Sequence, residues 1–367
     1  MTNQNATSSM VENPIVSGKS DSPLIIAGPC SAESESQVLS TARQLARIKD
    51  VSIFRAGIWK PRTRPNGFEG VGVEGLLWLQ KVKAETGLEV AIEVANTFHV
   101  EQALQHKIDY LWIGARTTVN PFSVQEIANA LKGVDVPVLV KNPVNPDVKA
   151  WIGALERVSK AGIKKLYAVH RGFSTYEKTP YRNAPKWEIP IELKRQIPEI
   201  PIISDPSHIS GNRNLIAELS QKAMDLAMDG LMIESHINPE VALSDAAQQI
   251  TPDTLDEILQ NLKIRKPEGN GLNGKHTLET LREEMDSVDN MLLEAIGKRI
   301  ELAKKLGDYK KSHNMTILQV NRWQQVLEDR IKQADYLGLD EKLVKEIYQL
   351  LHNQSVKIQG KMLNDEE

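Results

Sequence analysis

The chain has 367 residues, of which 41% are hydrophobic and 25% are charged, and its net charge is −3. These values are typical of a globular protein, and the balanced charge gives no reason to expect nucleic acid or an anionic membrane as a partner. No apolar run approaches the roughly 20 residues of a transmembrane helix. The only cysteine, Cys30, allows no internal disulfide and fits a cytoplasmic location. The length predicts one large domain and one small one.

Residues 1–22 are polar and small, so we expect a disordered tail rather than a signal peptide. Short apolar runs then recur at intervals of roughly 20–40 residues with helical patterns between them. The expected strands are Leu24–Ala27, Ser52–Phe54, Val90–Ile92, Tyr110–Ile113, Pro137–Val140, Leu166–Val169, Ile202–Ile203 and Leu231–Ile233. This repeat predicts a closed (β/α)8 barrel over residues 23–265. An open doubly wound sheet is the alternative, and it is disfavoured because no GxGxxG or GxxxxGK[ST] loop follows any run.

A charged or metal-binding side chain closes nearly every expected strand. In chain order these residues are Cys30, Arg55, Glu93, Arg116, Lys141, Arg171, His208 and Glu234. The C-terminal ends of barrel strands meet at one mouth, where such proteins keep their chemistry. Any one of these residues alone is more often a surface salt-bridge partner, but together they predict a site. The expected cations are Arg55, Lys60, Arg62, Arg116, Lys141 and Arg171, and such a cluster suits polyanionic small molecules.

The strands ending near residues 204 and 233 are followed by side chains that bind metals or protons. The expected metal ligands are Cys30, His208, Glu234 and Asp245. Cys30 belongs to this set because the first strand of a barrel is the neighbour of the eighth. A thiolate, an imidazole and two carboxylates form a set of mixed hardness that could take Mn, Fe, Zn or Co. The competing interpretation is capping and loop residues after ordinary strands, with Cys30 as a small buried hydrophobe.

Five motifs occur in order along this part of the chain. They are GPCSAE at Gly28–Glu33, RAGIWKPRT at Arg55–Thr63, GARTT at Gly114–Thr118, SDPSH at Ser204–His208 and IESHINPEVALSD at Ile233–Asp245. Together they resemble the 3-deoxy-D-arabino-heptulosonate 7-phosphate (DAHP) synthase family, in its type Iβ branch. The resemblance implies condensation of phosphoenolpyruvate with erythrose 4-phosphate and a required divalent metal. A sister enzyme that uses arabinose 5-phosphate shares much of the pattern, but the KPRT stretch resembles the erythrose-phosphate loop.

The resemblance also implies roles for individual residues. The metal ligands would be the four residues named above. The phosphoenolpyruvate-binding residues would be Arg55, Lys60, Arg116, Lys141 and Arg171, and those for erythrose 4-phosphate would be Lys60, Pro61, Arg62 and Thr63. The candidates for proton transfer are Glu93, Lys141 and His208. One departure from many relatives is Asn142-Pro143 after Lys141, where the proline is expected to stiffen and reshape the loop.

Lys266–Lys275 reads KPEGNGLNGK, which predicts a linker over residues 266–276. Beyond it, apolar residues recur at spacings of mostly three or four. The stripe comprises Leu278, Leu281, Met285, Val288, Leu292, Ala295, Leu302, Leu306 and Tyr309. A helix of about 35 residues would be roughly 50 Å long, which exceeds what a three-helix monomer can cover. We therefore expect residues 277–367 to form an all-α domain of three helices that intertwines with a second copy.

Arg299 interrupts this stripe where the spacing demands an apolar residue, so it is expected to answer a buried anion. Arg282 and Lys310 flank the same surface, while Ser355 and Gln359 share a face of the last helix. These groups suggest a pocket for a dicarboxylate. A structural polar layer that sets the helix register is the alternative.

LREEMDSVD, KRIELAKKLGDYK and SVKIQ, within Thr277–Met362, resemble the all-helical chorismate mutase family. The resemblance implies rearrangement of chorismate to prephenate without a metal or a nucleophile. The implied chorismate-binding residues are Arg282, Arg299, Lys310, Arg322, Ser355 and Gln359, of which Arg299, Lys310 and Gln359 are the catalytic candidates. Arg282 would reach into the site of the partner subunit. Gln319 and Trp323 depart from the family, which often carries acidic residues there.

The leading interpretation is a bifunctional enzyme in which a mutase-site ligand, prephenate, inhibits the synthase. A rival interpretation makes the helical domain a non-catalytic module that senses chorismate or prephenate and dimerises the protein. A third assigns the barrel to another aldol-type condensation, which arabinose 5-phosphate would reveal.

Overall fold

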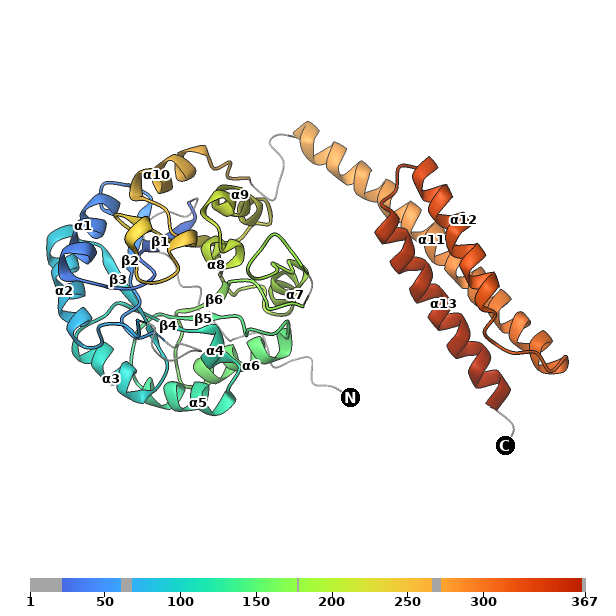
Figure 1. The fold of residues 1–367 in the computed structure, drawn as a ribbon, viewed down its shortest axis with the longest axis horizontal. Coiled ribbons are helices and arrows are strands. Elements are labelled where there is room, and N and C mark those ends of the chain that lie inside the picture. The colour runs from blue at the N-terminus through green and yellow to red at the C-terminus, as the bar shows by residue number, and fades with distance from the viewer. Residues whose placement is uncertain (1–21, 61–67, 177, 266–271, 365–367) are drawn as a thin grey trace. The chain divides into compact units, whose positions relative to one another are not determined.

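The computed structural model describes residues 22–60, 68–176, 178–265 and 272–364. The chain divides into two compact units, residues 1–267 and residues 268–367. The first is a barrel and the second is helical (Figure 1). Except for Ser22, the predicted tail at residues 1–22 lies outside the described residues.

Eight parallel strands form a closed barrel in which each strand pairs with the next and β8 pairs with β1. The strands are β1 (Leu24–Gly28), β2 (Val51–Arg55), β3 (Glu89–Val94), β4 (Tyr110–Ile113), β5 (Val138–Lys141), β6 (Leu166–His170), β7 (Ile202–Ser204) and β8 (Gly230–Glu234). Each overlaps one predicted strand, and the predicted (β/α)8 barrel is confirmed.

Helices surround the strands as an outer ring (Figure 1). The ring comprises α1 (Glu35–Leu45), α2 (Glu74–Thr86), α3 (Thr97–Gln105), α5 (Pro121–Ala130), α6 (Val148–Lys160), α7 (Glu188–Gln196), α9 (Ile216–Asp225) and α10 (Pro252–Asn261). The short helices α4 (Ala115–Thr118) and α8 (Pro206–Ser210) follow β4 and β7, and the 3-10 turns are η1 (Arg213–Leu215), η2 (Pro239–Val241) and η3 (Ala246–Gln248). Several of these helices begin with a side chain that accepts a hydrogen bond from a backbone N–H group. Examples are Ser34 at α1, Asn96 at α3 and Asp147 at α6.

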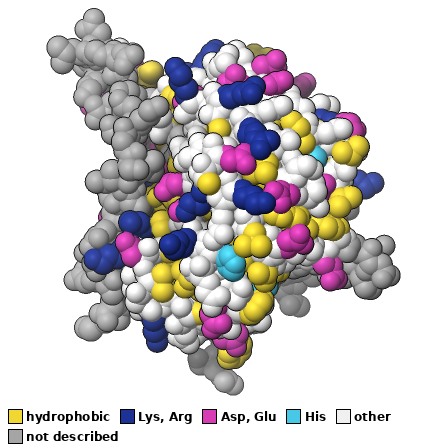
Figure 2. Space-filling view, turned by 90° about the vertical axis from the view of Figure 1, so that its left-hand side faces the viewer, with side chains coloured by type: hydrophobic (Ala, Val, Ile, Leu, Met, Phe, Trp, Pro, Cys, Tyr) yellow, Lys and Arg dark blue, Asp and Glu magenta, His cyan; other side chains and the backbone are white. Residues whose placement is uncertain are grey.

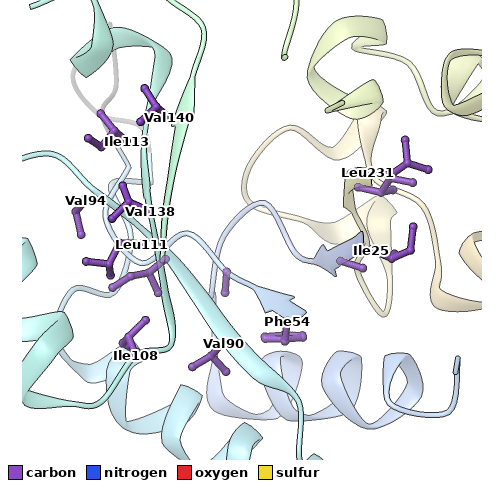
Figure 3. Packing of buried hydrophobic residues seen from close by; sticks show 14 of the residues in the cluster. Ile25, Phe54, Val90, Val94, Ile108, Leu111, Ile113, Val138, Val140 and Leu231 are labelled. Atoms are coloured by element: carbon purple, nitrogen blue, oxygen red, sulfur yellow. The ribbon is translucent and has the colours of Figure 1, made fainter. Parts of the chain in front are cut away.

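The barrel core has two layers because successive side chains of a strand point to opposite sides. One layer, which includes Trp112, Leu139 and Met232, fills the barrel interior. The other, which includes Leu111 and Val138, packs beneath the helices, and Figure 3 shows part of it. The alternation places the Trp112 side chain inside the barrel, on the strand that leads into the GARTT motif.

The helical unit comprises α11 (Leu272–Ser312), α12 (Val320–Tyr336) and α13 (Glu341–Asn364), and α13 packs against both of the others. The first helix spans 41 residues and begins inside the predicted linker. The reason is that Gly and Asn weaken a helix by about 1 kcal/mol or less each. The strong helix breaker of this stretch, Pro267, lies before the helix begins.

Most of the predicted apolar stripe on α11 is uncovered within one copy of the chain. Leu281, Met285 and Leu306 are 57%, 62% and 53% exposed. Among the described residues of this unit, the buried hydrophobic side chains are Ala303, Ala334 and Val344. Because each large side chain contributes about 1.5–3 kcal/mol when fully buried, one copy leaves most of this stabilisation unused.

On the face shown in Figure 2, Lys and Arg side chains lie among Asp and Glu side chains without a large region of one sign. Two of the surface ion pairs, Arg43–Glu85 and Lys81–Glu35, join α1 to α2. None of the helices among the described residues has both the length and the apolar character needed to cross a bilayer.

Candidate functional site

A cavity of about 380 Å³ opens among the loops that follow the strands. The predicted residues that line it are Lys60, Glu93, Arg116, Lys141, Arg171, His208 and Asp245. Cys30, Arg55 and Glu234 are buried, and Arg55 and Glu234 are linked to the lining by short contacts. Of the residues predicted for erythrose 4-phosphate, Lys60 is described, whereas Pro61, Arg62 and Thr63 lie outside the described residues.

The predicted metal ligands converge. Cys30, Glu234 and Asp245 each offer one ligand atom, and the three atoms lie within 4.8 Å of one another. Cys30 Sγ is 3.5 Å from Asp245 Oδ2, and His208 Nε2 is 3.7 Å from Glu234 Oε1. That buried oxygen of Glu234 accepts no hydrogen bond. A soft thiol, an imidazole and two carboxylates around an unsatisfied buried oxygen form a donor set that fits a divalent transition metal.

The protonation of this set follows from its burial. Burial, reinforced by the Glu234 carboxylate, raises the pKa of the Cys30 thiol to about 11. Burial also lowers the pKa of His208, which favours the neutral ring that can bind a metal. Asp245 has a left-handed backbone, with φ at 47°, a region in which Asp is several-fold enriched among non-glycine residues.

Asp205 joins two predicted residues of the cleft, the candidate metal ligand His208 and the cation Lys141. Its Oδ2 accepts a hydrogen bond from Lys141 Nζ at 2.8 Å and lies 2.8 Å from His208 Nδ1. Its Oδ1 caps α8 by accepting from the His208 backbone N–H at 3.0 Å. Burial alone would raise the pKa of Asp205, but His208 and Lys141 hold it well below its usual range. Asp205 is one of the metal- or proton-binding side chains that follow the strand ending near residue 204, but the sequence pattern gives it no place among the predicted metal ligands.

Trp112 supports three of the predicted residues. The Arg55 guanidinium lies over its ring at 4.8 Å and Lys141 Nζ at 5.8 Å. Its indole N–H donates to Glu93 Oε2 at 3.1 Å. Arg55 is only 1% exposed, and its Nη2 lies 3.2 Å from Glu234 Oε1. Sequence reasoning missed Trp112 because an aromatic residue within an apolar strand has the pattern of ordinary core.

Arg116 follows Gly114 at the start of α4, where the chain passes close to Glu93. A Cβ at Gly114 would lie 2.0 Å from Glu93 Oε1, so a larger residue there would displace the Glu93 carboxylate. Another cation of the cavity, Arg171, donates from Nη1 to Asn183 Oδ1 at 2.6 Å. Burial lowers the pKa of Arg171 to about 10, which leaves it charged at neutral pH.

The Asn142-Pro143 departure has a defined structure. The buried Asn142 side chain donates to the Pro143 carbonyl at 2.8 Å and the Gly172 carbonyl at 2.9 Å. Its Oδ1 accepts from the Arg171 backbone N–H at 2.7 Å. The amide therefore fixes the loop that follows Lys141 to the loop that carries Arg171.

Two cavity residues have no strand-end signal at all. Arg182 and Asn183 lie between β6 and α7. Arg182 Nη1 donates to Asp245 Oδ1 at 3.1 Å. A segment without periodicity or a motif offers nothing in the sequence from which this position could be inferred.

In the helical unit, four of the six predicted chorismate-binding residues meet between α11 and α13. Arg299 Nη1 donates to Ser355 Oγ at 2.8 Å, and Lys310 Nζ donates to Gln359 Oε1 at 3.2 Å. Trp323 stacks on His352 with ring centroids 4.0 Å apart. Burial, followed by Arg299 and Lys310, lowers the pKa of His352, a residue that sequence reasoning missed.

The other two predicted residues are not brought to this group. Arg322 is exposed on α12, and the exposed Arg282 donates to Glu279 on its own helix. Arg282 precedes Arg299 by 17 residues, or about 25 Å along a helix. It therefore cannot reach the Arg299 cluster of its own chain.

Comparisons with known proteins assign both units. The model of the DAHP synthetase I family matches residues 3–267, and that of chorismate mutase type II matches residues 281–360. A phospho-2-dehydro-3-deoxyheptonate aldolase from Thermotoga maritima is 31% identical over 239 residues, covering 65% of this chain and 68% of the relative. A 2-dehydro-3-deoxyphosphooctonate aldolase from Vesicomyosocius okutanii is 28% identical over 266 residues, covering 65% and 89%.

Solved structures agree. The crystal structure of the Thermotoga maritima DAHP synthase matches with a TM-score of 0.59 and 30% identity, covering 66% of this chain and 68% of that one. A truncated form of that enzyme matches with a TM-score of 0.58 and 28% identity, covering 66% and 85%. The chain therefore belongs to the DAHP synthetase I family, with a chorismate mutase type II domain fused after its barrel.

Proposed function

We propose that the barrel cleft condenses phosphoenolpyruvate with erythrose 4-phosphate beside a divalent metal ion, and that the helical domain rearranges chorismate to prephenate. One observation carries the first proposal. An imidazole and a carboxylate line one cavity together with buried and half-buried cations, and a thiol and a second carboxylate lie buried beside them. Such a cleft suits a reaction that joins two anions beside an electrophilic carbonyl.

The cations solve the first difficulty of this reaction, which is repulsion between its substrates. Arg116, Lys141 and Arg171 would hold the phosphate and carboxylate of phosphoenolpyruvate. Lys60, with Arg62 and Thr63, would hold the second phosphate. Fixing both substrates replaces a disfavoured encounter with an intramolecular one. The enol carbon then bonds to the aldehyde carbon, water adds to the resulting cationic carbon, and cleavage of its C–O bond releases inorganic phosphate.

Cys30, His208, Glu234 and Asp245 would hold the metal ion, with Mn as the first choice and Fe, Co or Zn as alternatives. When bound, such an ion acts as a Lewis acid toward a carbonyl oxygen. The protein's own residues supply proton transfer. Lys141 and His208 share the Asp205 carboxylate, which links two of the three proton-transfer candidates by hydrogen bonds. Glu93 lines the same cavity.

The synthase proposal predicts phosphate release from phosphoenolpyruvate only in the presence of erythrose 4-phosphate. A chelator is expected to abolish it and Mn²⁺ to restore it. Lys141→Met is expected to reduce kcat/KM by at least about 100-fold, because it removes a cation aimed at developing charge. The matched control is Lys165→Met, which removes an exposed lysine paired with Asp135.

Two results would contradict this assignment. Equal activity of Lys141→Met and Lys165→Met would remove Lys141 from the mechanism. Faster turnover of arabinose 5-phosphate than of erythrose 4-phosphate would assign the barrel to a different condensation.

For the helical domain, we infer catalysis by charge and shape alone. Arg299 and Lys310 would hold the carboxylates of chorismate in a folded conformer, with Ser355 and Arg322 as further contacts. Lys310 and Gln359 would stabilise charge on the breaking ether oxygen. Arg282 would come from the partner subunit, since it lies too far along α11 to serve its own site.

One observation favours the rival role as a sensor. Trp323 replaces an acidic residue that binds a substrate hydroxyl in related mutases, and it stacks on His352 beside this site. A domain that binds chorismate or prephenate without turnover would retain the same cations.

Chorismate consumption by the full-length chain separates the two roles. We expect turnover that Arg299→Ala lowers by at least about 100-fold, because a charge-stabilising donor is lost. The control Arg330→Ala removes a cation of α12 that lies near the Tyr348 ring instead. Absence of turnover in the unaltered chain, together with saturable prephenate binding, would establish the sensor.

The exposed stripe on α11 supports an intertwined dimer. Leu292→Glu places a charge in this stripe and is expected to yield monomers in analytical ultracentrifugation, with loss of mutase activity. Glu294→Lys, on the same helix and outside the stripe, should remain a dimer. A dimeric Leu292→Glu chain would show that the stripe is not the interface.

Fusion of the two domains supports feedback by the mutase product. Saturating prephenate is expected to lower the synthase rate of the unaltered chain, and Arg299→Ala should relieve this inhibition by weakening prephenate binding. The measurement is phosphate release with and without prephenate. An unchanged rate in the unaltered chain would argue against feedback by this ligand.

A further inference from the structure

The Arg182 guanidinium contacts one predicted metal ligand, Asp245, directly and a second, Glu234, through Gln248. Besides its bond to Asp245 Oδ1, Arg182 Nη1 donates to Gln248 Oε1 at 2.7 Å. Gln248 Nε2 donates in turn to Glu234 Oε2 at 2.6 Å. One guanidinium therefore holds one carboxylate directly and a second through a single buried amide.

In both carboxylates, one oxygen accepts one of these hydrogen bonds and the other oxygen does not. In Asp245, Oδ1 is held by Arg182 and Oδ2 lies 3.5 Å from Cys30 Sγ. In Glu234, Oε2 is held by Gln248, and Oε1 lies 3.7 Å from His208 Nε2. One oxygen of each group is thus fixed. The other faces the Cys30 thiol in Asp245, and in Glu234 it faces both the His208 imidazole and Arg55 Nη2, which lies 3.2 Å away. Hydrogen bonds of this kind orient metal ligands in proteins.

Arg182 is itself held against the helix that carries His208. Its backbone N–H donates to the Ser210 carbonyl at 3.0 Å, and Asn183 Nδ2 donates to the His208 carbonyl at 2.6 Å. A Cβ at Gly211 would lie 2.5 Å from the Arg182 Cβ, so the close approach depends on glycine there. The guanidinium therefore starts from a fixed backbone rather than a free loop.

We propose that Arg182 is a positioning residue that orients the Asp245 and Glu234 carboxylates to bind a divalent metal ion. This rests on the proposed function, because it requires that these carboxylates bind metal. The competing effect of Arg182 is Coulombic, since a cation beside the site repels a metal ion and its removal would strengthen binding. The two effects have opposite signs, so metal affinity distinguishes them.

The test is Mn²⁺ binding to the metal-free full-length chain, measured by isothermal titration calorimetry without substrates. Arg182→Met is expected to weaken binding by about 10- to 100-fold, the usual effect of losing such a partner. Arg182→Lys keeps the charge and a donor, and it should fall between that variant and the unaltered chain. Gln248→Met removes the amide that links Arg182 to Glu234 but leaves the bond between Arg182 and Asp245 in place. It should also weaken Mn²⁺ binding. It keeps the test decisive if Arg182→Met does not fold.

The matched control is Arg213→Met. Arg213 pairs with Glu240 and donates to the Ala246 carbonyl, so the variant disturbs the same loop region without removing a bond to either carboxylate. Its Mn²⁺ affinity should match that of the unaltered chain.

Three results would overturn the proposal. Unchanged or tighter Mn²⁺ binding by both Arg182→Met and Gln248→Met would show that neither residue positions a ligand. Equal weakening in Arg213→Met would attribute the loss to general disturbance of the loops. Absence of Mn²⁺ binding by the unaltered chain would refute the metal site of the proposed function, and the role of Arg182 with it.

Discussion

A buried ion pair between Arg55 and Glu234 is the constraint on which the cleft depends. Both side chains are almost inaccessible to water, and burying such charges costs several kcal/mol per ion unless each charge has a partner of opposite charge and hydrogen bonds. Trp112, whose ring lies under the Arg55 guanidinium, and Gln248, which donates to Glu234, offset part of this cost. Arg55 Nε and Nη1 and Glu234 Oε1 still have no hydrogen-bond partner. The rigid strands β2 and β8 hold these groups in place, and an anion beside Arg55 and a cation beside Glu234 would complete the balance.

In the helical domain, apolar rather than charged side chains lack partners within one copy of the chain. Polar contacts join α11 to α13, from Arg299 to Ser355 and from Lys310 to Gln359, whereas most of the long apolar stripe is exposed in a single copy. Small ions and anionic substrates would balance the buried charges of the barrel. The apolar stripe would instead need a second apolar surface of similar length to cover it. If the proposed function holds, the barrel is completed by ligands and the helical domain by a second copy, so different measurements report on each.

The sequence predicted the parts of the site that follow from repetition. Strand ends recur along the chain and meet at one mouth, so the positions of Cys30, Lys141 and His208 in one site follow from the strand pattern. The roles of Trp112 and Arg182 do not, because they come from contacts between distant segments that no local pattern encodes. The start of α11 was predicted too late for a related reason. Gly and Asn weaken a helix locally without forbidding it, so the boundary depends on a small balance of energies.

The left-handed backbone of Asp245 narrows what this position can accept. For most side chains that conformation costs about 1–2 kcal/mol, whereas asparagine, like aspartate, adopts it readily. Replacement by alanine or valine would therefore alter the loop conformation and the ligand together, and only asparagine would isolate the charge. Two independent requirements thus act on one residue: its side chain must offer an oxygen to the cleft, and its backbone must bend in a way that few residues tolerate.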